Sequence, residues 1–132
     1  MKRAWFGFGV ACFFGAAVAC NPFAPDQSVV LDVEKIDAPA TSLVGSPLIV
    51  VLIVTIDMCQ SFDHIEATSV ASGASLTAWG IDATIGNKNI ACPTIIKSEA
   101  HSYQFKPSVR GPFQITVDRG RVSPLTATVQ VQ

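Results

Sequence analysis

The stretch 47-PLIVVLIVTID-57 decides the fold class of this chain. Valine and isoleucine dominate it, and such β-branched side chains favour strands over helices. Its eleven residues are too few for a helix that crosses a bilayer, which needs about 20. We therefore expect a strand that is buried on both faces or lies at the centre of a sandwich, and that forms the main part of the core.

Shorter runs with strand character lie on both sides of this stretch. In 28–36, Val29, Leu31 and Val33 form an alternating pattern that is typical of a half-buried strand. Residues 37–46 contain proline and glycine and are expected to connect two strands. Further strands are expected at 63–70, 75–85, 90–97, 102–106, 112–118 and 125–131.

Turn residues separate these runs, as in ASGAS, GNKN and DRGRVSP. Seven or eight strands with a break every eight to twelve residues predict an all-β, antiparallel sandwich. The chain has 132 residues, of which 49% are hydrophobic and 14% charged. It therefore suits a single domain with one core.

The N-terminal segment has the composition of an export signal. Lys2 and Arg3 precede an uncharged apolar run at 4–19, and these correspond to the charged and hydrophobic regions of a signal peptide. The run contains three glycines and is shorter than a spanning helix, which needs about 20 residues. We expect residues 1–19 to be a signal peptide that is removed.

Cys20 decides between a secreted and a membrane-anchored protein. Ala17-Val18-Ala19 meets the small-x-small rule of ordinary signal peptidase, so cleavage is expected just before Cys20. The residues AVAC also resemble the lipobox of bacterial lipoproteins, with Ala17 at the position where the best examples have Leu. That resemblance implies a diacylglycerol on the Cys20 sulfur. Asn21 after it implies sorting to an outer membrane or display at the surface.

The lipoprotein resemblance also implies a location and a domain plan. The chain is expected to be exported and held at the cell membrane or the outer membrane, facing the periplasm or the exterior. Two or three acyl chains anchor stably, because each buried methylene contributes about 0.8 kcal/mol. Residues 20–27 are then the lipidated cysteine and a short linker, and 28–132 are the folded domain.

The number of cysteines bears on the same question. Cys12 leaves with the signal, so Cys20, Cys59 and Cys92 remain in an exported and oxidising compartment. If Cys20 is acylated, Cys59 and Cys92 are left to form one disulfide. If the protein is simply secreted, one cysteine stays unpaired at the exposed N-terminus.

Several segments resemble small exported bacterial proteins with an immunoglobulin-like sandwich. They are IDMCQSFDHIEA at 56–67, IACP at 90–93, and the pattern F-x-P-x-x-x-G-x-F-x-I-x-V at 105–117. The resemblance covers residues 28–132 and implies a Cys59–Cys92 bridge at the periphery of the domain. It implies no catalytic residue and no cofactor.

The charge of the mature chain argues against nucleic-acid binding. Loss of Lys2 and Arg3 leaves 7 basic residues against 10 acidic ones, a net charge of about −3. A protein that binds the phosphate backbone needs the opposite sign.

His64 and His101 are the candidate metal ligands. Asp63 and Glu66 lie beside His64, and two histidines with carboxylates suit a transition metal if the fold brings them together. The histidines are 37 residues apart, so no short spacing forces them together. We expect surface side chains instead. A blue-copper site needs Cys, His and Met close together late in the chain, and nothing after His101 supplies them.

Other chemistry has little support in the sequence. There is no G-x-S-x-G nucleophile motif and no D-x-D-x-D-G calcium loop, so we predict no enzymatic activity. Trp79, Tyr103, Phe105 and Phe113 are expected to pack in the core or cover a sheet face. Three arginines near the C-terminal turns offer a basic cluster for an acidic partner: Arg110, Arg119 and Arg121.

The sequence therefore predicts a membrane-anchored binding or structural module. Its partner is expected to be a protein or an envelope component, held through loops or a sheet edge. Two other functions remain open, namely an exported metal-binding protein that uses His64 and His101, and a protease-inhibitor-like domain that acts through its loops.

Overall fold

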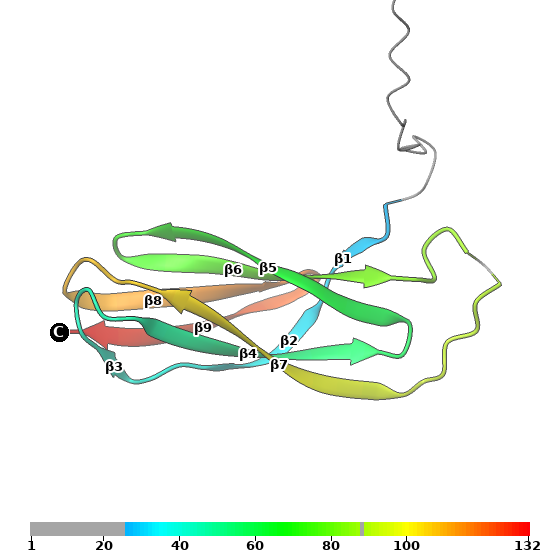
Figure 1. The fold of residues 1–132 in the computed structure, drawn as a ribbon, viewed down its shortest axis with the longest axis horizontal. Coiled ribbons are helices and arrows are strands. Elements are labelled where there is room, and N and C mark those ends of the chain that lie inside the picture. Colours follow the sequence, from blue (N-terminus) through cyan, green and yellow to red (C-terminus); the bar gives the residue numbers. More distant parts are fainter. Residues whose placement is uncertain (1–25, 88) are drawn as a thin grey trace, which may run out of the picture.

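A computed structural model describes residues 26–87 and 89–132 of the chain (Figure 1). The predicted signal peptide and Cys20 lie outside the described residues. Within them, nine strands form two sheets and there is no helix. An all-β, two-layered domain with one disulfide is therefore confirmed.

The two sheets have six and three strands. The larger sheet contains β1 (Ser28–Val30), β3 (Thr41–Ser42), β5 (Gln60–Val70), β6 (Gly73–Asp82), β8 (Gly111–Arg119) and β9 (Val122–Val131). The smaller sheet contains β2 (Asp32–Asp37), β4 (Leu48–Asp57) and β7 (Ile96–Phe105), with β4 in the middle.

Strand β4 is the apolar stretch on which the fold prediction depends. It lies at the centre of its sheet, and alternate residues from Leu48 to Ile56 are buried. It is not buried on both faces, because Ile49 on the other face is 54% exposed. No described element covers that face, so the continuous apolar run reflects a central position rather than double burial.

The larger sheet corrects the prediction of an antiparallel sandwich. Strand β6 pairs with β5 along one edge, so β1 and β8 share its other edge, at Trp79–Ile81 and Gly73–Thr77 respectively. The β6–β8 and β3–β9 pairs are parallel. The β6–β8 pair is parallel because the chain leaves β6, forms β7 in the other sheet and returns to the same starting end.

The run at 28–36 is also not one strand. It divides at Leu31 into β1 in the larger sheet and β2 in the smaller one. Leu31 is buried, and its N–H donates to the Ala78 carbonyl at 2.8 Å. Its side chain lies over Gly80, where a Cβ would come within 2.6 Å of Leu31 Cδ2 and of the Ser61 carbonyl oxygen. Residues 28–37 thus pass from the larger sheet to the smaller one at Leu31.

Two further strand predictions were wrong. Residues 90–95 form a connection rather than a strand, and β7 runs without a break through the polar segment before 102–106. Pro93 and the bond at Cys92 stand in that connection. Polar residues are tolerated in β7 because it is an edge strand with much of its surface exposed.

The hydrophobic core lies between the sheets and draws on both. Its largest fully buried side chains are Leu31, Leu48, Leu52, Ile56, Leu76 and Ile115. Phe105 and Phe113 are buried at one end of it, as expected for core aromatics, while Trp79 is half-buried and Tyr103 packs against the core from β7.

We expect Gly80→Ala to lower the free energy of unfolding by about 1–3 kcal/mol, because the new methyl group overlaps Leu31 and the backbone of β5. Urea denaturation measures the change. Ser75→Ala on the exposed face of the same strand is the control and should shift stability by less than about 0.5 kcal/mol. Equal effects of the two substitutions would contradict the packing of Leu31 on Gly80.

Candidate binding surface

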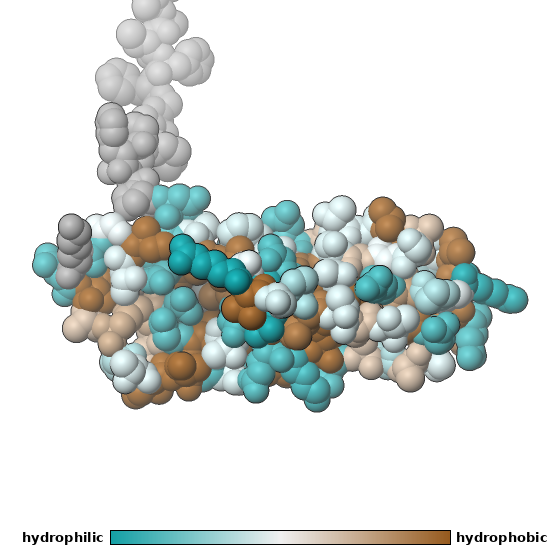
Figure 2. Space-filling model, turned by 180° about the vertical axis from the view of Figure 1, so that it is seen from behind, coloured by the Kyte–Doolittle hydropathy of each residue, from teal (hydrophilic) through white to brown (hydrophobic). Residues whose placement is uncertain are grey.

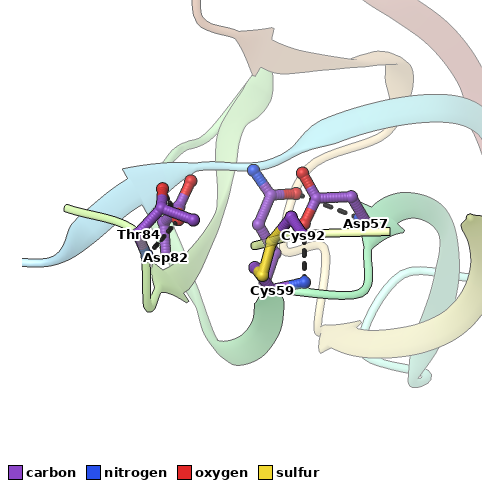
Figure 3. Close-up of a disulfide and its surroundings, with 6 residues drawn as sticks. Asp57, Cys59, Asp82, Thr84 and Cys92 are labelled. Atoms are coloured by element: carbon purple, nitrogen blue, oxygen red, sulfur yellow. Dashed lines mark hydrogen bonds between the residues drawn. A yellow bond between two sulfur atoms is a disulfide. The ribbon is translucent and has the colours of Figure 1, made fainter. Parts of the chain in front are cut away.

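The disulfide joins two connections at one end of the sandwich (Figure 3). Cys59 follows β4, and Cys92 lies in the long connection between β6 and β7; their Cα atoms are 5.8 Å apart. Neither cysteine belongs to the core cluster. We call this the disulfide end, comprising residues 57–60, 82–87 and 89–96 together with Gln27.

Hydrogen bonds fix the entry of the chain at the disulfide end. The N–H of Asp82 donates to the Gln27 carbonyl at 2.9 Å, and the next N–H, of Ala83, donates to the Cys59 carbonyl at 3.0 Å. The Cys59 N–H donates to Asp57 Oδ1 at 2.9 Å. Two neighbouring residues therefore hold both the start of β1 and the disulfide turn.

Asp82 also organises the turn that follows it. Its Oδ1 accepts hydrogen bonds from the hydroxyl and the N–H of Thr84, at 2.6 and 2.9 Å (Figure 3). These hydrogen bonds lower the pKa of Asp82 because they favour its charged form. The turn is therefore held by a carboxylate rather than by a neutral acid.

A groove separates the edge strands β5 and β7, with a volume of about 420 Å³. The ring of Phe62 stacks on His101 with centroids 3.5 Å apart. His101 Nε2 lies 3.0 Å from Glu99, whose other oxygen lies 3.1 Å from Lys97 Nζ. These hydrogen bonds lower the pKa of Glu99.

The two candidate metal ligands both border this groove. His101 pairs with Leu52 on the core-facing side of its sheet, whereas His64 pairs with Trp79 on the outer side of the other sheet. His64 Nδ1 is 2.8 Å from its neighbour Asp63. Across the described residues, no three His, Cys, Asp or Glu side chains are grouped as a metal site requires.

The edges of β5 and β7 are protected against further strand pairing. Strand β5 has a bulge between Phe62 and His64, and bulges disrupt the ladder that an added strand needs. Lys97 and Glu99 on β7 lie opposite buried β4 residues, so they are charged groups on the core-facing side of an edge strand. Such groups discourage edge-to-edge association.

Three loops, at 43–47, 71–72 and 106–110, meet at the opposite end of the sandwich. We call these loops, together with Val70 at the end of β5, the far end. The Gly45 N–H donates to the Pro107 carbonyl at 2.8 Å, and the Gln114 N–H donates to the Ser72 carbonyl at 3.1 Å. The first bond joins the loop at 43–47 to the loop at 106–110, and the second joins the loop before β6 to β8. The far end is therefore one continuous surface.

The far end exposes large apolar side chains beside a cavity. Leu43, Val70 and Val109 are each at least half exposed, and hydrophobic side chains reach the surface at both ends of the view in Figure 2. A cavity of about 250 Å³ lies between the loops at 69–71 and 105–108, with Phe105 and Phe113 in its wall. Exposed apolar groups around a cavity are typical of interaction sites.

The same end is basic. Lys106 and Arg110 are exposed there, and none of the acidic residues of the sequence falls in 41–49, 67–74 or 104–114. An apolar surface with two cations and no acidic side chain suits a partner that presents carboxylates or phosphates next to apolar groups.

The predicted cluster of three arginines does not form. Arg110 precedes β8, whereas Arg119 ends it, so about 30 Å of strand separates them. Arg119 Nε instead donates to Asp32 at 3.0 Å, and Arg121 lies in the turn that follows. Only Arg110 contributes to the far end.

Sequence patterns missed most of the far-end residues. Leu43 and Val109 lie in segments whose glycines, prolines and serines indicate turns, while Val70 and Lys106 are the last residues of runs predicted as strands. The available signal was the presence of bulky apolar residues within those turns, since turns normally carry small or polar side chains.

The chain matches no protein-family model, no curated protein and no solved structure at a significant level. In the part of the chain that the structure describes, there is no helix long and apolar enough to cross a membrane.

Removal of the bridge by Cys59→Ser with Cys92→Ser should lower the free energy of unfolding by about 3 to 4 kcal/mol, because the bridge closes a loop of 33 residues. Chemical denaturation of oxidised wild type and the double variant measures this. The reduced wild type is the control and should match the variant, while an unchanged midpoint in both would contradict a stabilising bridge.

Proposed function

We propose that this chain is a non-enzymatic bacterial lipoprotein that binds a protein or envelope partner through its far end. The anchor is a lipid on Cys20 after removal of residues 1–19. The apolar signal-like segment, the AVAC sequence and the pairing of Cys59 with Cys92 support it, because that pairing leaves Cys20 without a disulfide partner among the cysteines outside the signal.

We also infer that the domain is a variant of the immunoglobulin-like sandwich. Support comes from its two packed sheets, the single core between them and the peripheral bridge. The variation lies in the two parallel strand pairs and in the N-terminal run, which divides into β1 of one sheet and β2 of the other.

The observation that carries the proposal is the opposite placement of chain entry and exposed loops. Gln27 is held at the disulfide end, where β4 finishes, and the apolar basic loops lie where β4 starts. The ten residues of β4 span about 33 Å. An N-terminal anchor would therefore leave the far end facing away from the membrane, accessible to a partner.

The far end also defines the chemistry of the partner. Val70, Val109 and the cavity beside Phe105 offer apolar contact, while Lys106 and Arg110 attract negative charge. We propose an acidic segment with large apolar side chains, because complementary charge steers association and apolar burial supplies affinity.

No observation favours the other two functions. His101 lies on the core-facing side of the smaller sheet and His64 on the outer side of the larger one. Each histidine is hydrogen-bonded to a carboxylate of its own strand. A protease-inhibitor-like role would also use exposed loops, but nothing in the far-end loops selects a protease over another protein.

We expect photo-crosslinking in the producing cells to reveal the partner at the far end. A benzophenone amino acid at Val109 should give a discrete crosslinked species, and the same group at Val122 should not give it. Both valines are 51% exposed, so they are matched in accessibility.

The yield of the crosslinked species should also depend on the positive charges of the far end. Lys106→Glu with Arg110→Glu should reduce its yield about tenfold, because two attractive contacts become repulsive. Lys35→Glu, in an exposed ion pair with Asp37 on another face, is the control. The proposal fails if charge reversal at the far end leaves the yield unchanged, or if Val122 captures the same species.

A further inference from the structure

We propose that the disulfide end rests on the lipid surface, with Met58, Ile90, Ile95 and Ile96 in contact with the apolar part of the bilayer interface. This inference rests on the proposed lipid anchor at Cys20. It goes beyond that anchor because it assigns to the folded domain a second membrane contact with a fixed orientation.

The four side chains belong to one exposed apolar cluster. Their exposed fractions range from 39% to 67%. Ile96 pairs with Asp57, the residue before Met58, and the bond between Cys59 and Cys92 holds the connection that carries Ile90 and Ile95 against the same turn. Residues from two parts of the sequence therefore expose apolar surface at a single end of the domain.

The distance between Cys20 and the domain favours this end as the membrane contact. Only five residues lie between Cys20 and Asp26, and the six Cα–Cα steps allow at most about 21 Å. Asp26 already accepts a hydrogen bond from the Ser28 N–H at 2.9 Å, and Gln27 is bonded to Asp82. The anchor therefore keeps the apolar cluster within reach of the bilayer surface.

The far end cannot take this position without turning the domain on its side. It also exposes apolar side chains, but it lies a full length of β4 from the chain entry, about 33 Å. A short tether favours contact by the nearer end, since each additional ångström of separation uses up the limited reach of the linker.

The charges near the cluster indicate which lipids it contacts. Among the described residues, Asp26, Asp57 and Asp82 lie at this end, with Lys97 beside Ile96. Arg119 and Arg121 lie farther from the cluster, in and next to the β8–β9 turn by Val30, and Arg119 is paired with Asp32. The three carboxylates closest to the cluster outnumber its one neighbouring ammonium group, so these groups do not attract anionic headgroups. We therefore assign the contact to neutral or zwitterionic lipid, with apolar burial rather than charge as its source, so salt should not weaken it.

Fluorescence quenching by brominated lipid tests the orientation. The full chain is purified from cells that process it and placed in phosphatidylcholine vesicles, after intact-mass spectrometry has established whether Cys20 carries acyl groups. In a Trp79→Phe background, Ile95→Trp should lose about half of its emission in vesicles of brominated phosphatidylcholine, because interfacial tryptophan lies near the bromines. Ile96→Trp serves as a second reporter at the same end.

Val70→Trp at the far end is the matched control, since Val70 and Ile96 have nearly equal exposed fractions, 66% and 67%. Its emission should be unchanged, and the difference in quenching between the two ends should persist in high salt.

Equal quenching at both ends, or none at either, overturns the inference while leaving the anchor intact. Absence of acyl mass on Cys20 overturns both the anchor and the inference. A blue shift at Ile95→Trp that depends on protein concentration in detergent points to a second copy and also overturns it.

Discussion

The arrangement of this domain depends on two consecutive backbone hydrogen bonds. Asp82 is the last residue of β6 and Ala83 follows it, and their N–H groups donate to the Gln27 and Cys59 carbonyls respectively. The first bond fixes where the chain enters the sandwich, and the second fixes the turn that carries the disulfide. Because these two bonds come from adjacent residues, the chain entry at Gln27 and the disulfide turn at Cys59 cannot move apart without disrupting the end of β6. The carboxylate of Asp82 then holds the following turn through Thr84. The distinction between the two ends of the molecule follows from this connection.

Much of the fold is predictable from local patterns, and the exceptions have physical causes. Alternating burial in β4, β6 and β8 follows from the two-residue period of a strand. The core residues of these strands are therefore predictable from the sequence. The split at Leu31 was not, because alternation is the same whether a strand stays in one sheet or passes to the other. Parallel pairing of β6 with β8 depends on a connection through the second sheet, which leaves no local signal. The continuity of β7 was hidden because an edge strand tolerates polar residues.

The candidate site was less predictable than the fold for a related reason. Leu43, Lys106 and Val109 come from loops and Val70 from the end of β5, and their meeting depends on hydrogen bonds such as that from the Gly45 N–H to the Pro107 carbonyl. Arg110 and Arg119 are close in sequence but lie at opposite ends of β8. The predicted cluster of arginines was therefore wrong. Two groups of charges nevertheless differ between the ends: Asp26, Asp57 and Asp82 lie at the disulfide end, and Lys106 and Arg110 lie at the far end without an acidic side chain in the neighbouring segments. This distribution suits a domain that approaches neutral lipid at one end and an acidic partner at the other.

The central claim is that the domain stands upright on the membrane, with its disulfide end down and its far end exposed. Neutron reflectometry of the acylated chain on a supported phosphatidylcholine bilayer measures the thickness of the protein layer directly. Upright domains should give a layer of at least about 35 Å, because β4 alone spans about 33 Å along that direction. A layer of about 25 Å, close to the width of strands packed side by side, would show that the domain lies flat and would contradict the account.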